Sequence, residues 1–588
     1  MVTTTKTNVE DQLKQYGKQQ KNILQILRNI QLSQHCISQD NIEQLSEALD
    51  LPKMKIQSKI DFYRFLHNSY AGDYEIYFSN SITDQMLGSE KLIQLLCELL
   101  FVKPGVTRED NRVTVDTTSC TGLCEQGPAM LVNGYAIGNL DVERIKNIAA
   151  LVSRGIPLEK WPHEWFQVAD TIHEQGPLLA TESVPGEAIR KALQLGPEGV
   201  IGELEKSGLR GCGGAGFPTH MKWNIARTTA ETERYVVCNA DEGEPGTFKD
   251  RTLLNQYADT VLDGMAVCAA TIGAKQGFIY LRHEYHFLLE RLQQKLQQRR
   301  DCNLLGDKIL GQDGFDFDIE IIMGVGSYVC GEESALIESL QGMRGIPRIR
   351  PPFPVTNGYF NKPTVVNNVE TYGYAARILE HGPDLFSKGG NSIGWKILSI
   401  SGDCEKPGIY EIPLGISIEK ILNKCKAKET QAVQVGGAGG SLVSSEQFFK
   451  EISFDEANTG GSFIIFNDSR DMFDRAVNFT HFFAHESCGF CTPCRVGTKL
   501  MAQMADKVKS GHGAHLDIKE IHELSHLMTQ ASHCGLGQRA AVPMLETYQK
   551  FPESFRKRLT SDEYQPSFDV EAAIQRAKEI IADQETGN

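Results

Sequence analysis

The sequence lacks any long uncharged apolar run. Its longest apolar stretch, around 261–281, contains Asp263, Lys275 and Gln276, whereas a membrane-spanning helix needs roughly 18–20 consecutive apolar residues. The first residues, MVTTTKTNVEDQ, also lack the apolar centre of a secretory signal. We therefore expect no membrane span and a cytoplasmic location.

The chain also lacks an excess of positive charge. Lys and Arg number 60 and Asp and Glu 75 in 588 residues, a net charge of −15. Proteins that bind a phosphate backbone depend on clustered Lys and Arg, so we expect no nucleic-acid ligand. We find no internal repeat and no low-complexity tract. The 41% hydrophobic and 23% charged residues are ordinary for a globular protein of several domains.

Cysteine and glycine, in contrast, are abundant. The 15 cysteines are an odd number, and a disulfide framework is improbable in a reducing compartment. Buried thiols or metal ligands are the remaining interpretations. The 54 glycines gather in tight clusters, which indicates loops that surround a ligand.

Changes in pattern along the chain predict a multidomain α/β protein. Short apolar strands alternate with helices in the largest block, which predicts a mostly parallel sheet, and an Asn-Gly pair predicts a hairpin turn at 133–134. The expected parts are a helical segment (1–68), a small α/β domain (69–155), a linker (156–185), a large α/β domain (186–392), a small β-grasp-like domain (393–470) and a helical bundle (471–588).

The strongest metal signal opens the last of these parts. ESCGFCTPCRVG places Cys488, Cys491 and Cys494 at C-x2-C-x2-C spacing, and Cys534 follows in SHCGLGQ. Three thiolates at this spacing and one distant thiolate can hold a [4Fe–4S] cluster. The alternatives are zinc, which more often uses separated cysteine pairs or histidines, and a group of buried structural thiols.

A second signal comes from loops in the large α/β domain. GLRGCGGAGFPTHMKW (208–223, ending in Lys222 and Trp223) is too rich in glycine for a core segment, and its backbone N–H groups could approach a phosphate. CNADEGEPGTFKDR places Asp241, Glu242 and Glu244 after a strand, at the edge where parallel sheets bind ligands. The alternatives are a surface glycine loop and a solvated acidic turn.

Two further segments complete the pattern. GSYVCGEESALIES contains Tyr328, Gly331, Glu332 and Glu333. RPPFPVTNGYFNKPTVVNNVET contains Arg350, Phe353, Asn367 and Asn368. Adjacent asparagines at the end of a strand can donate hydrogen bonds to a ring or a ribityl chain.

These loops, in this order, resemble the NADH-oxidising flavoprotein subunit of respiratory complex I and its soluble relatives. The resemblance covers about 186–550, and residues 1–155 resemble the small thioredoxin-like subunit of that complex, fused in front. The fusion is similar to the diaphorase flavoprotein subunit of cytoplasmic NAD-reducing [NiFe] hydrogenases. The partners implied are a small Fe–S diaphorase subunit and the [NiFe] hydrogenase subunits, in a hetero-oligomer.

The resemblance implies FMN, NAD(H) and one [4Fe–4S] cluster as cofactors. The residues implied for FMN are Gly211, Gly213, Lys222, Asn239, Asp241, Glu242, Tyr328, Gly331, Glu332, Asn367 and Asn368. Those implied for NAD(H) are Phe217, Glu244, Glu333, Arg350 and Phe353. Glu333 would lie by the adenosine ribose and favour NADH over NADPH, because a carboxylate repels a 2′-phosphate. The alternative is that Glu333 only caps the helix that begins there, where an acid suits the helix dipole.

The sequence departs from the family at two places. Cys212 stands where the glycine loop normally has arginine, and the alternatives are a solvent-exposed thiol and a spacer turned away from the flavin. The thioredoxin-like domain of the family holds a [2Fe–2S] cluster on four cysteines. Here Cys120 and Cys124 keep one pair, while Ser79 and Asp84 occupy the other positions. Soft iron–sulfur sites prefer thiolates, so we expect no [2Fe–2S] cluster.

The implied function is electron exchange between NADH and a partner subunit, by way of FMN and the [4Fe–4S] cluster. A flavin can handle both the hydride of nicotinamide and the single electrons of a cluster. Two alternatives remain: the same module could serve a formate dehydrogenase or a complex I-like assembly, or the chain could be a cluster-bearing scaffold without flavin.

Overall fold

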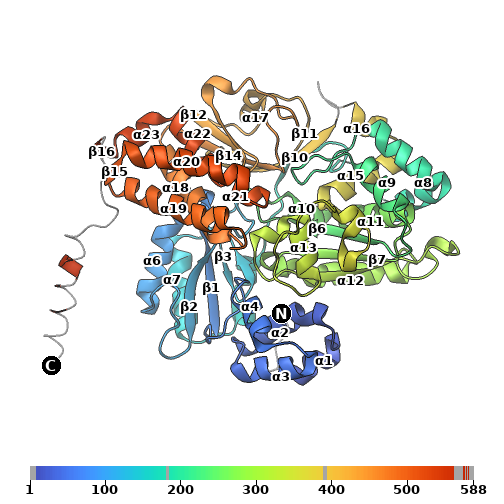
Figure 1. Ribbon diagram of the computed structural model, residues 1–588, viewed down its shortest axis with the longest axis horizontal. Coiled ribbons are helices and arrows are strands. Elements are labelled where there is room, and N and C mark those ends of the chain that lie inside the picture. The colour runs from blue at the N-terminus through green and yellow to red at the C-terminus, as the bar shows by residue number, and fades with distance from the viewer. Residues whose placement is uncertain are drawn as a thin grey trace. The chain divides into compact units, whose positions relative to one another are not determined.

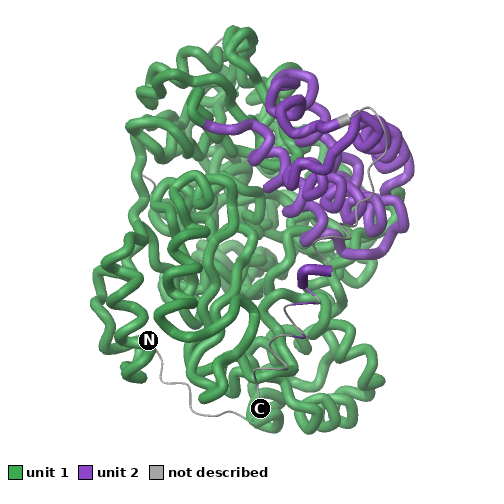
Figure 2. Tube along the Cα trace, turned by 90° about the vertical axis from the view of Figure 1, so that its left-hand side faces the viewer, with its two compact units in different colours: residues 1–469 green, residues 470–588 purple. Residues whose placement is uncertain are grey.

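The computed structural model describes residues 8–180, 184–388 and 394–561, together with 574–576, 578 and 581 (Figure 1). The chain divides into two compact units, residues 1–469 and 470–588, which Figure 2 colours separately. No helix among the described residues is long and apolar enough to cross a membrane.

The first unit begins with helices α1 (Val9–Tyr16), α2 (Ile23–Gln34), α3 (Gln39–Leu49) and α4 (Lys53–Ile60). Ser38 caps α3, because its side chain accepts from the Asn41 N–H while the Asn41 side chain accepts from the Ser38 N–H. The apolar faces of these helices share a core with Val237, Phe278 and Tyr280 of the large domain. The helical segment therefore covers one face of that domain's sheet.

The small α/β domain has a four-stranded sheet in the order β2-β1-β3-β4. Strands β1 and β2 are parallel, and β3 and β4 form the expected hairpin, with Asn133 and Gly134 at positive φ in its turn. Its elements are β1 (Tyr74–Ser79), α5 (Ile82–Met86), α6 (Ser89–Leu100), β2 (Val113–Thr118), β3 (Met130–Val132), β4 (Tyr135–Ile137) and α7 (Val142–Ser153).

The large domain has an all-parallel sheet in the order β8-β7-β6-β9, as the alternation of strands and helices predicted. Val236 and Cys238 point into one core and Val237 into the other, because successive side chains of a strand face opposite sides. The sheet is therefore buried on both faces, as parallel sheets are. Its strands are β6 (Tyr235–Ala240), β7 (Gln276–Leu281), β8 (Asp318–Met323) and β9 (Thr364–Asn368).

Helices α8, α11 and α15 pack against one another beside this sheet. The helices of the domain are α8 (Glu187–Ser207), α9 (Thr219–Thr228), α10 (Lys249–Gln256), α11 (Ala258–Ile272), α12 (Leu289–Asp301), α13 (Glu333–Leu340), α14 (Pro354–Asn357), α15 (Val369–His381) and α16 (Asp384–Ser387). Two 3-10 turns, His283–Leu288 and Tyr328–Gly331, follow β7 and β8.

The third sheet of the first unit is mixed, in the order β13-β12-β14-β10-β11-β5. Strand β5 lies within 156–185, which we expected to be a linker, and it pairs in parallel with β11. This segment is part of a folded sheet because Glu411 of β11 accepts from the N–H groups of Gly176, Leu178 and Leu179. The elements are β5 (Ile172–Glu174), β10 (Trp395–Gly402), β11 (Gly408–Pro413), α17 (Ile418–Lys424), β12 (Thr430–Val435), β13 (Ser441–Ser444) and β14 (Ser462–Asn467).

The second unit is largely helical. Its described elements are α18 (Met472–Glu486), α19 (Thr492–Lys509), β15 (Gly513–Ala514), α20 (His515–Ala531), α21 (Gly535–Arg539), α22 (Val542–Lys550), α23 (Pro552–Arg556) and β16 (Leu559–Ser561). Helix α18 packs on α19 and α22, and α19 packs on α20.

Candidate active site and metal centre

The predicted site residues of the first unit gather at the carboxyl edge of the parallel sheet. Strands β6 and β9 are neighbours, with Cys238 opposite Asn367 and Asn239 opposite Asn368. The acidic loop (241–251) therefore leaves the sheet beside the paired asparagines. Loops at this edge are where parallel α/β sheets bind ligands.

The glycine loop (208–217) reaches the same edge. The N–H of Gly211 donates to the Phe217 carbonyl at 2.9 Å, which closes the loop. A methyl group on Gly213 would lie only 3.4 Å from the Asn368 Cβ. Gly213 is exposed, so the loop offers backbone without side chains beside the end of β9. A backbone cradle of this kind fits a phosphate or a flavin.

Cys212 in this loop is buried, with 3% of its surface exposed. Its N–H donates to the Thr371 hydroxyl at 2.9 Å, and burial raises the pKa of its thiol to about 12. The interpretation as a solvent-exposed thiol is therefore wrong, because the side chain turns into the core of the large domain. An arginine at this position would have to enter that core.

The acidic loop and the turn Tyr328–Gly331 hold each other in place. Asn239 Nδ2 donates to the Gly331 carbonyl at 2.8 Å. The Tyr328 hydroxyl donates to Glu244 at 2.6 Å, and Glu244 also accepts from the Ala438 N–H at 2.7 Å. A methyl group on Gly243 would lie 3.2 Å from the Tyr328 ring. The loops after β6 and β8 are thus brought together, with Asp241 next to Gly331.

Glu242 is buried and its carboxylate faces the start of α10. It accepts from the N–H groups of Asp250 and Arg251 at 2.8 and 3.2 Å, and from the Tyr285 hydroxyl at 2.8 Å. Burial, with the nearby Asp250 carboxylate, raises the pKa of Glu242 to about 7. In this arrangement Glu242 fixes the shape of the acidic loop from within.

Lys222, at the end of the glycine segment, connects α9 to two other parts of the site. Its Nζ lies 2.7 Å from Glu333 Oε2 and donates to the Val366 carbonyl, also at 2.7 Å. The neighbouring Trp223 Nε1 donates to Asn367 Oδ1 at 3.0 Å. The contacts of Lys222 with Val366 and of Trp223 with Asn367 hold α9 against the end of β9.

Two adjacent glutamates at the start of α13, Glu332 and Glu333, make different contacts. Glu332 caps this helix, since its side chain accepts from the N–H groups of Ser334 and Ala335. Glu332 also lies 3.1 Å from Arg350. Glu333 instead pairs with Lys222. A capping role for Glu333, the alternative to ribose binding, is therefore taken by its neighbour.

Two predicted aromatic residues are largely exposed. Phe217 has 45% and Phe353 has 50% of its surface exposed. Large exposed aromatic side chains are candidates for stacking on a ligand ring. Both rings are therefore accessible to a planar ligand.

The reasoning from sequence missed the charged residues beneath these loops. Lys249 donates to Asn368 Oδ1 at 2.9 Å and lies 3.0 Å from Glu370. Lys396 donates to the Cys212 carbonyl at 3.0 Å. The sequence does contain one indication of this contact, since Lys396 is a charged residue within the apolar strand WKILSISG. Its partner Cys212, however, is 184 residues away in the chain.

The four cysteines of the second unit lie before or within the first turns of α19 and α21. Cys491 and Cys534 directly precede α19 and α21, and Cys494 lies in the first turn of α19. Burial, together with the nearby thiols of Cys491, Cys534 and Cys488, raises the pKa of the Cys494 thiol to about 12. A methyl group on Gly537 would lie 2.8 Å from the Cys494 Cβ, which shows how closely α21 approaches α19.

The chemistry of this donor set fits an iron–sulfur cube. Iron–sulfur clusters of this kind are held by four cysteine thiolates, and the second unit has four cysteines, three of them at C-x2-C-x2-C spacing. Cys488, Cys491, Cys494 and Cys534 are thus the residues that could hold the cluster.

The positions that correspond to a [2Fe–2S] site in the small α/β domain hold a hydrogen-bonded group. Asp84 accepts from the hydroxyls of Ser79 and Ser81 at 2.6 and 2.5 Å and from the Ala129 N–H at 2.8 Å. The sulfurs of Cys120 and Cys124 lie 3.5 Å apart. Burial raises the pKa of Asp84 to about 6. These polar side chains satisfy one another, so the donor set does not fit a four-thiolate cluster.

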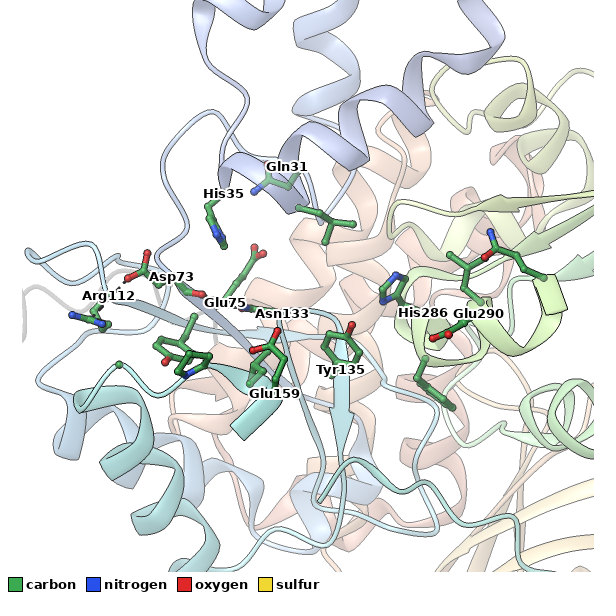
Figure 3. Close-up of a pocket in the computed structure, with 18 residues that line it drawn as sticks. Gln31, His35, Asp73, Glu75, Arg112, Asn133, Tyr135, Glu159, His286 and Glu290 are labelled. Carbon is green, nitrogen blue, oxygen red and sulfur yellow. Dashed lines mark hydrogen bonds and ion pairs between the residues drawn. The ribbon is translucent and has the colours of Figure 1, made fainter. Parts of the chain in front are cut away.

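A separate cavity of about 660 Å³ lies between α2, the edge of the small α/β domain and the start of α12 (Figure 3). Its walls carry Asp73, Glu75, Glu159 and Glu290 together with Tyr135. Glu75 is already 3.1 Å from His67. None of the residues that line the cavity belongs to the glycine or acidic loop.

Comparison with known proteins identifies the family. The chain is 36% identical to NAD-reducing hydrogenase HoxS subunit alpha of Cupriavidus necator over 97% of its own length and 98% of that protein. The chain belongs to this hydrogenase subunit alpha family. A crystal structure of an NAD+-reducing [NiFe]-hydrogenase in the H2-reduced state contains a chain that matches the alpha-family fold with a TM-score of 0.91 and 36% identity, covering 96% of this chain and 97% of that one.

Three family models match within this alpha-family chain. They are the Nuo51 FMN-binding domain at residues 204–376, the thioredoxin-like [2Fe-2S] ferredoxin at 9–153, and the NADH-ubiquinone oxidoreductase-F iron-sulfur binding region at 474–558. NADP-reducing hydrogenase subunit HndC of Solidesulfovibrio fructosivorans is 38% identical over 63% of this chain and 78% of that protein. One subunit of the NADH-quinone oxidoreductase of Aquifex aeolicus is 38% identical over 63% of this chain and 88% of that protein.

Proposed function

We propose that this chain is the NAD(H)-oxidising flavoprotein subunit of an NAD-reducing hydrogenase. The single observation that carries this proposal is the match to subunit alpha of such an enzyme along nearly the whole of both chains. The NADH-quinone oxidoreductase relative aligns with only 63% of this chain. The full-length match, which includes the N-terminal part, favours a hydrogenase partner over a formate dehydrogenase or a complex I-like assembly.

In this proposal the glycine loop, the acidic loop and the ends of β6 and β9 hold FMN. The residues are Gly211, Gly213, Lys222, Asn239, Asp241, Glu242, Tyr328, Gly331, Glu332, Asn367 and Asn368. Support comes from their convergence at one edge of the sheet. When bound there, FMN exchanges a hydride with nicotinamide and passes single electrons to or from an iron–sulfur cluster.

The chain's own part in this chemistry is binding and orientation. The glycine loop brings backbone without side chains to the end of β9, and a glycine-rich backbone of this kind favours an anionic phosphate. Asn239 and the Lys222–Glu333 pair fix the loops against one another. Phe217 and Phe353 are exposed surfaces on which a nicotinamide or adenine ring can stack. The NAD(H) site is completed by Glu244, Glu333 and Arg350.

We propose that Cys488, Cys491, Cys494 and Cys534 hold a [4Fe–4S] cluster that exchanges electrons with a small Fe–S diaphorase subunit and, through it, the [NiFe] subunits. The small α/β domain carries no [2Fe–2S] cluster and instead docks on the large α/β domain. Arg251 donates to the Gly122 carbonyl at 2.7 Å and Arg282 to the Cys120 carbonyl at 2.6 Å. The division into domains, with the β-grasp-like part at 393–470, and a cytoplasmic location belong to this proposal.

The test is NADH-dependent dye reduction by the purified chain, combined with flavin and iron analysis. The proposal expects a yellow protein with one FMN and four irons per chain, which reduces a soluble dye with NADH. A protein that holds iron but no flavin and does not oxidise NADH would instead match the cluster-bearing scaffold and overturn the proposal. The partner is identified by the proteins that copurify with the chain: the proposal expects hydrogenase subunits and not formate dehydrogenase subunits.

A further inference from the structure

A buried lysine from the next domain holds the centre of the glycine loop. Lys396 lies on β10 and has 3% of its surface exposed. Its Nζ donates to the Cys212 carbonyl at 3.0 Å and pairs with the Glu370 carboxylate. On its other side, the Cys212 peptide donates its N–H to Thr371. Both polar groups of residue 212, between Gly211 and Gly213, are therefore fixed by side chains.

Lys396 belongs to a closed group of buried charges. Glu370 is fully buried, lies 3.0 Å from Lys249, and accepts from the Ile397 N–H at 2.8 Å. Lys249 also binds Asp250 at 2.6 Å. Burial alone would lower the pKa of Lys249, but the carboxylates of Asp250 and Glu370 raise it well above its usual value. Lys249 and Lys396 thus share the Glu370 carboxylate under the loop, and Asp250 and the buried Glu242 lie near Lys249.

A group of buried charges contributes little net stability to a fold. Removing water from charged side chains costs several kcal/mol for each ion, and apolar side chains of similar size often stabilise a core better. The contacts of this group are directed at the site: Lys396 holds the Cys212 carbonyl, and Lys249 holds Asn368. Its position suits a role in the site more than a role in stability.

We propose that Lys396 is a positioning residue that sets the geometry of the glycine loop and raises the reduction potential of the flavin bound there. This inference rests on the proposed FMN site. Reduction adds negative charge to the flavin, and a buried cation close to the loop favours the reduced form. Lys396 supplies a cation to this loop from the side of the core.

The experiment compares Lys396→Met, Lys396→Arg and Glu370→Gln with the wild-type chain. Lys420→Met is the control, since Lys420 is an exposed lysine on α17 of the same domain. Two quantities are measured: the dissociation constant for FMN, by reconstitution of the flavin-free chain, and the midpoint potential of the bound flavin, by anaerobic titration. Neither requires turnover.

We expect Lys396→Met to weaken FMN binding about tenfold. We also expect it to lower the reduced-to-oxidised ratio about tenfold at a fixed potential, about 30 mV for a two-electron couple. Lys396→Arg should restore both values to within a few-fold. Glu370→Gln removes a negative charge and should move the potential upward, opposite to Lys396→Met. The control should match the wild type.

Three results would overturn the inference. One is a wild-type affinity and potential in Lys396→Met. Another is a shift of the potential in the same direction for Lys396→Met and Glu370→Gln, which would indicate loosening of the core rather than charge. If Lys396→Met does not fold, Glu370→Gln decides alone, and an unchanged or lowered potential contradicts the inference. A wild-type chain that binds no FMN would instead defeat the proposed function itself.

Discussion

Glu333 and Lys222 form an ion pair at the start of α13, and the cap of that helix is the neighbouring Glu332. The pair holds the Glu333 carboxylate at a fixed place beside the proposed dinucleotide site. A carboxylate there accepts hydrogen bonds from ribose hydroxyls and repels the 2′-phosphate of NADPH. At the scale of single residues, we therefore propose that the Glu333 carboxylate determines the preference for NADH over NADPH.

The first prediction changes that charge. Glu333→Gln should raise kcat/KM for NADPH about tenfold, about 1.4 kcal/mol, because the repulsion disappears and Lys222 loses its carboxylate partner. The kcat/KM for NADH should change little. Steady-state kinetics with both nucleotides measure this, with the exposed Glu446→Gln as control. An unchanged NADH/NADPH ratio with flavin retained would exclude Glu333 as the selectivity residue.

The second prediction concerns Cys212. An arginine side chain does not fit where the thiol is 3% exposed and packed in the core of the large domain. Cys212→Arg should lower the melting temperature and the flavin content, since overpacking typically costs about 1–3 kcal/mol. Cys212→Ser, which keeps the peptide contacts to Thr371 and Lys396, should retain both. A Cys212→Arg chain with full flavin and unchanged stability would contradict the buried position.

At the scale of elements, Glu411 of β11 binds residues 176–179, a segment whose sequence has no helical or strand periodicity. This buried carboxylate accepts from three backbone N–H groups in 176–179 and from the Tyr374 hydroxyl. Burial raises the pKa of Glu411 to about 6. The segment that joins the small and large α/β domains is therefore anchored to the third sheet.

The third prediction is that Glu411→Gln destabilises the first unit by about 2–4 kcal/mol, because an amide cannot accept from all four donors and unmet buried groups are costly. The wild-type pKa lies above that of the unfolded chain, so the folded state binds the proton more tightly. Its contribution to stability therefore falls as pH rises from about 4.5 to about 6.

Chemical denaturation between pH 4.5 and pH 7 measures both effects, with the exposed Glu405→Gln as control. In Glu411→Gln the loss of stability on raising the pH should be smaller than in the wild type. A variant with wild-type stability at every pH would mean that Glu411 does not anchor the segment.

The sequence predicts those elements that form through interactions between residues close together in the chain. The strands of the parallel sheet and the Asn133–Gly134 hairpin could be predicted, because periodicity and turn chemistry act over a few residues. Strand β5, with the sequence IHE, could not, because it forms only by pairing with β11. The site loops were found through their motifs, whereas Lys396 and Glu411 act on groups distant in the chain.

At the scale of the whole chain, residues 9–153, which include the small α/β domain, match the model of thioredoxin-like [2Fe-2S] ferredoxins, and Cys120 and Cys124 are the expected thiol pair that the sequence retains. Ser79 and Asp84 are hydrogen-bonded to each other, and the loop with Cys120 is bound by Arg282 of the large domain. These contacts are the basis of our proposal that the domain serves for contact with the large domain.

The fourth prediction is that the purified full-length chain shows no [2Fe–2S] signal in electron paramagnetic resonance after reduction. The double variant S79C/D84C restores the thiolate positions, and a new signal in this variant would show that these residues exclude the cluster. A [2Fe–2S] signal in the wild-type chain would overturn the docking interpretation.

The most direct measurement of the proposed relay is electron delivery from NADH to the small Fe–S diaphorase subunit, in the wild-type complex and in Cys488→Ala. Dye reduction by NADH, measured in the same samples, reports on the flavin site alone. We predict that Cys488→Ala removes the [4Fe–4S] signal and abolishes delivery to the partner subunit, while dye reduction persists. Undiminished delivery in Cys488→Ala would contradict the account.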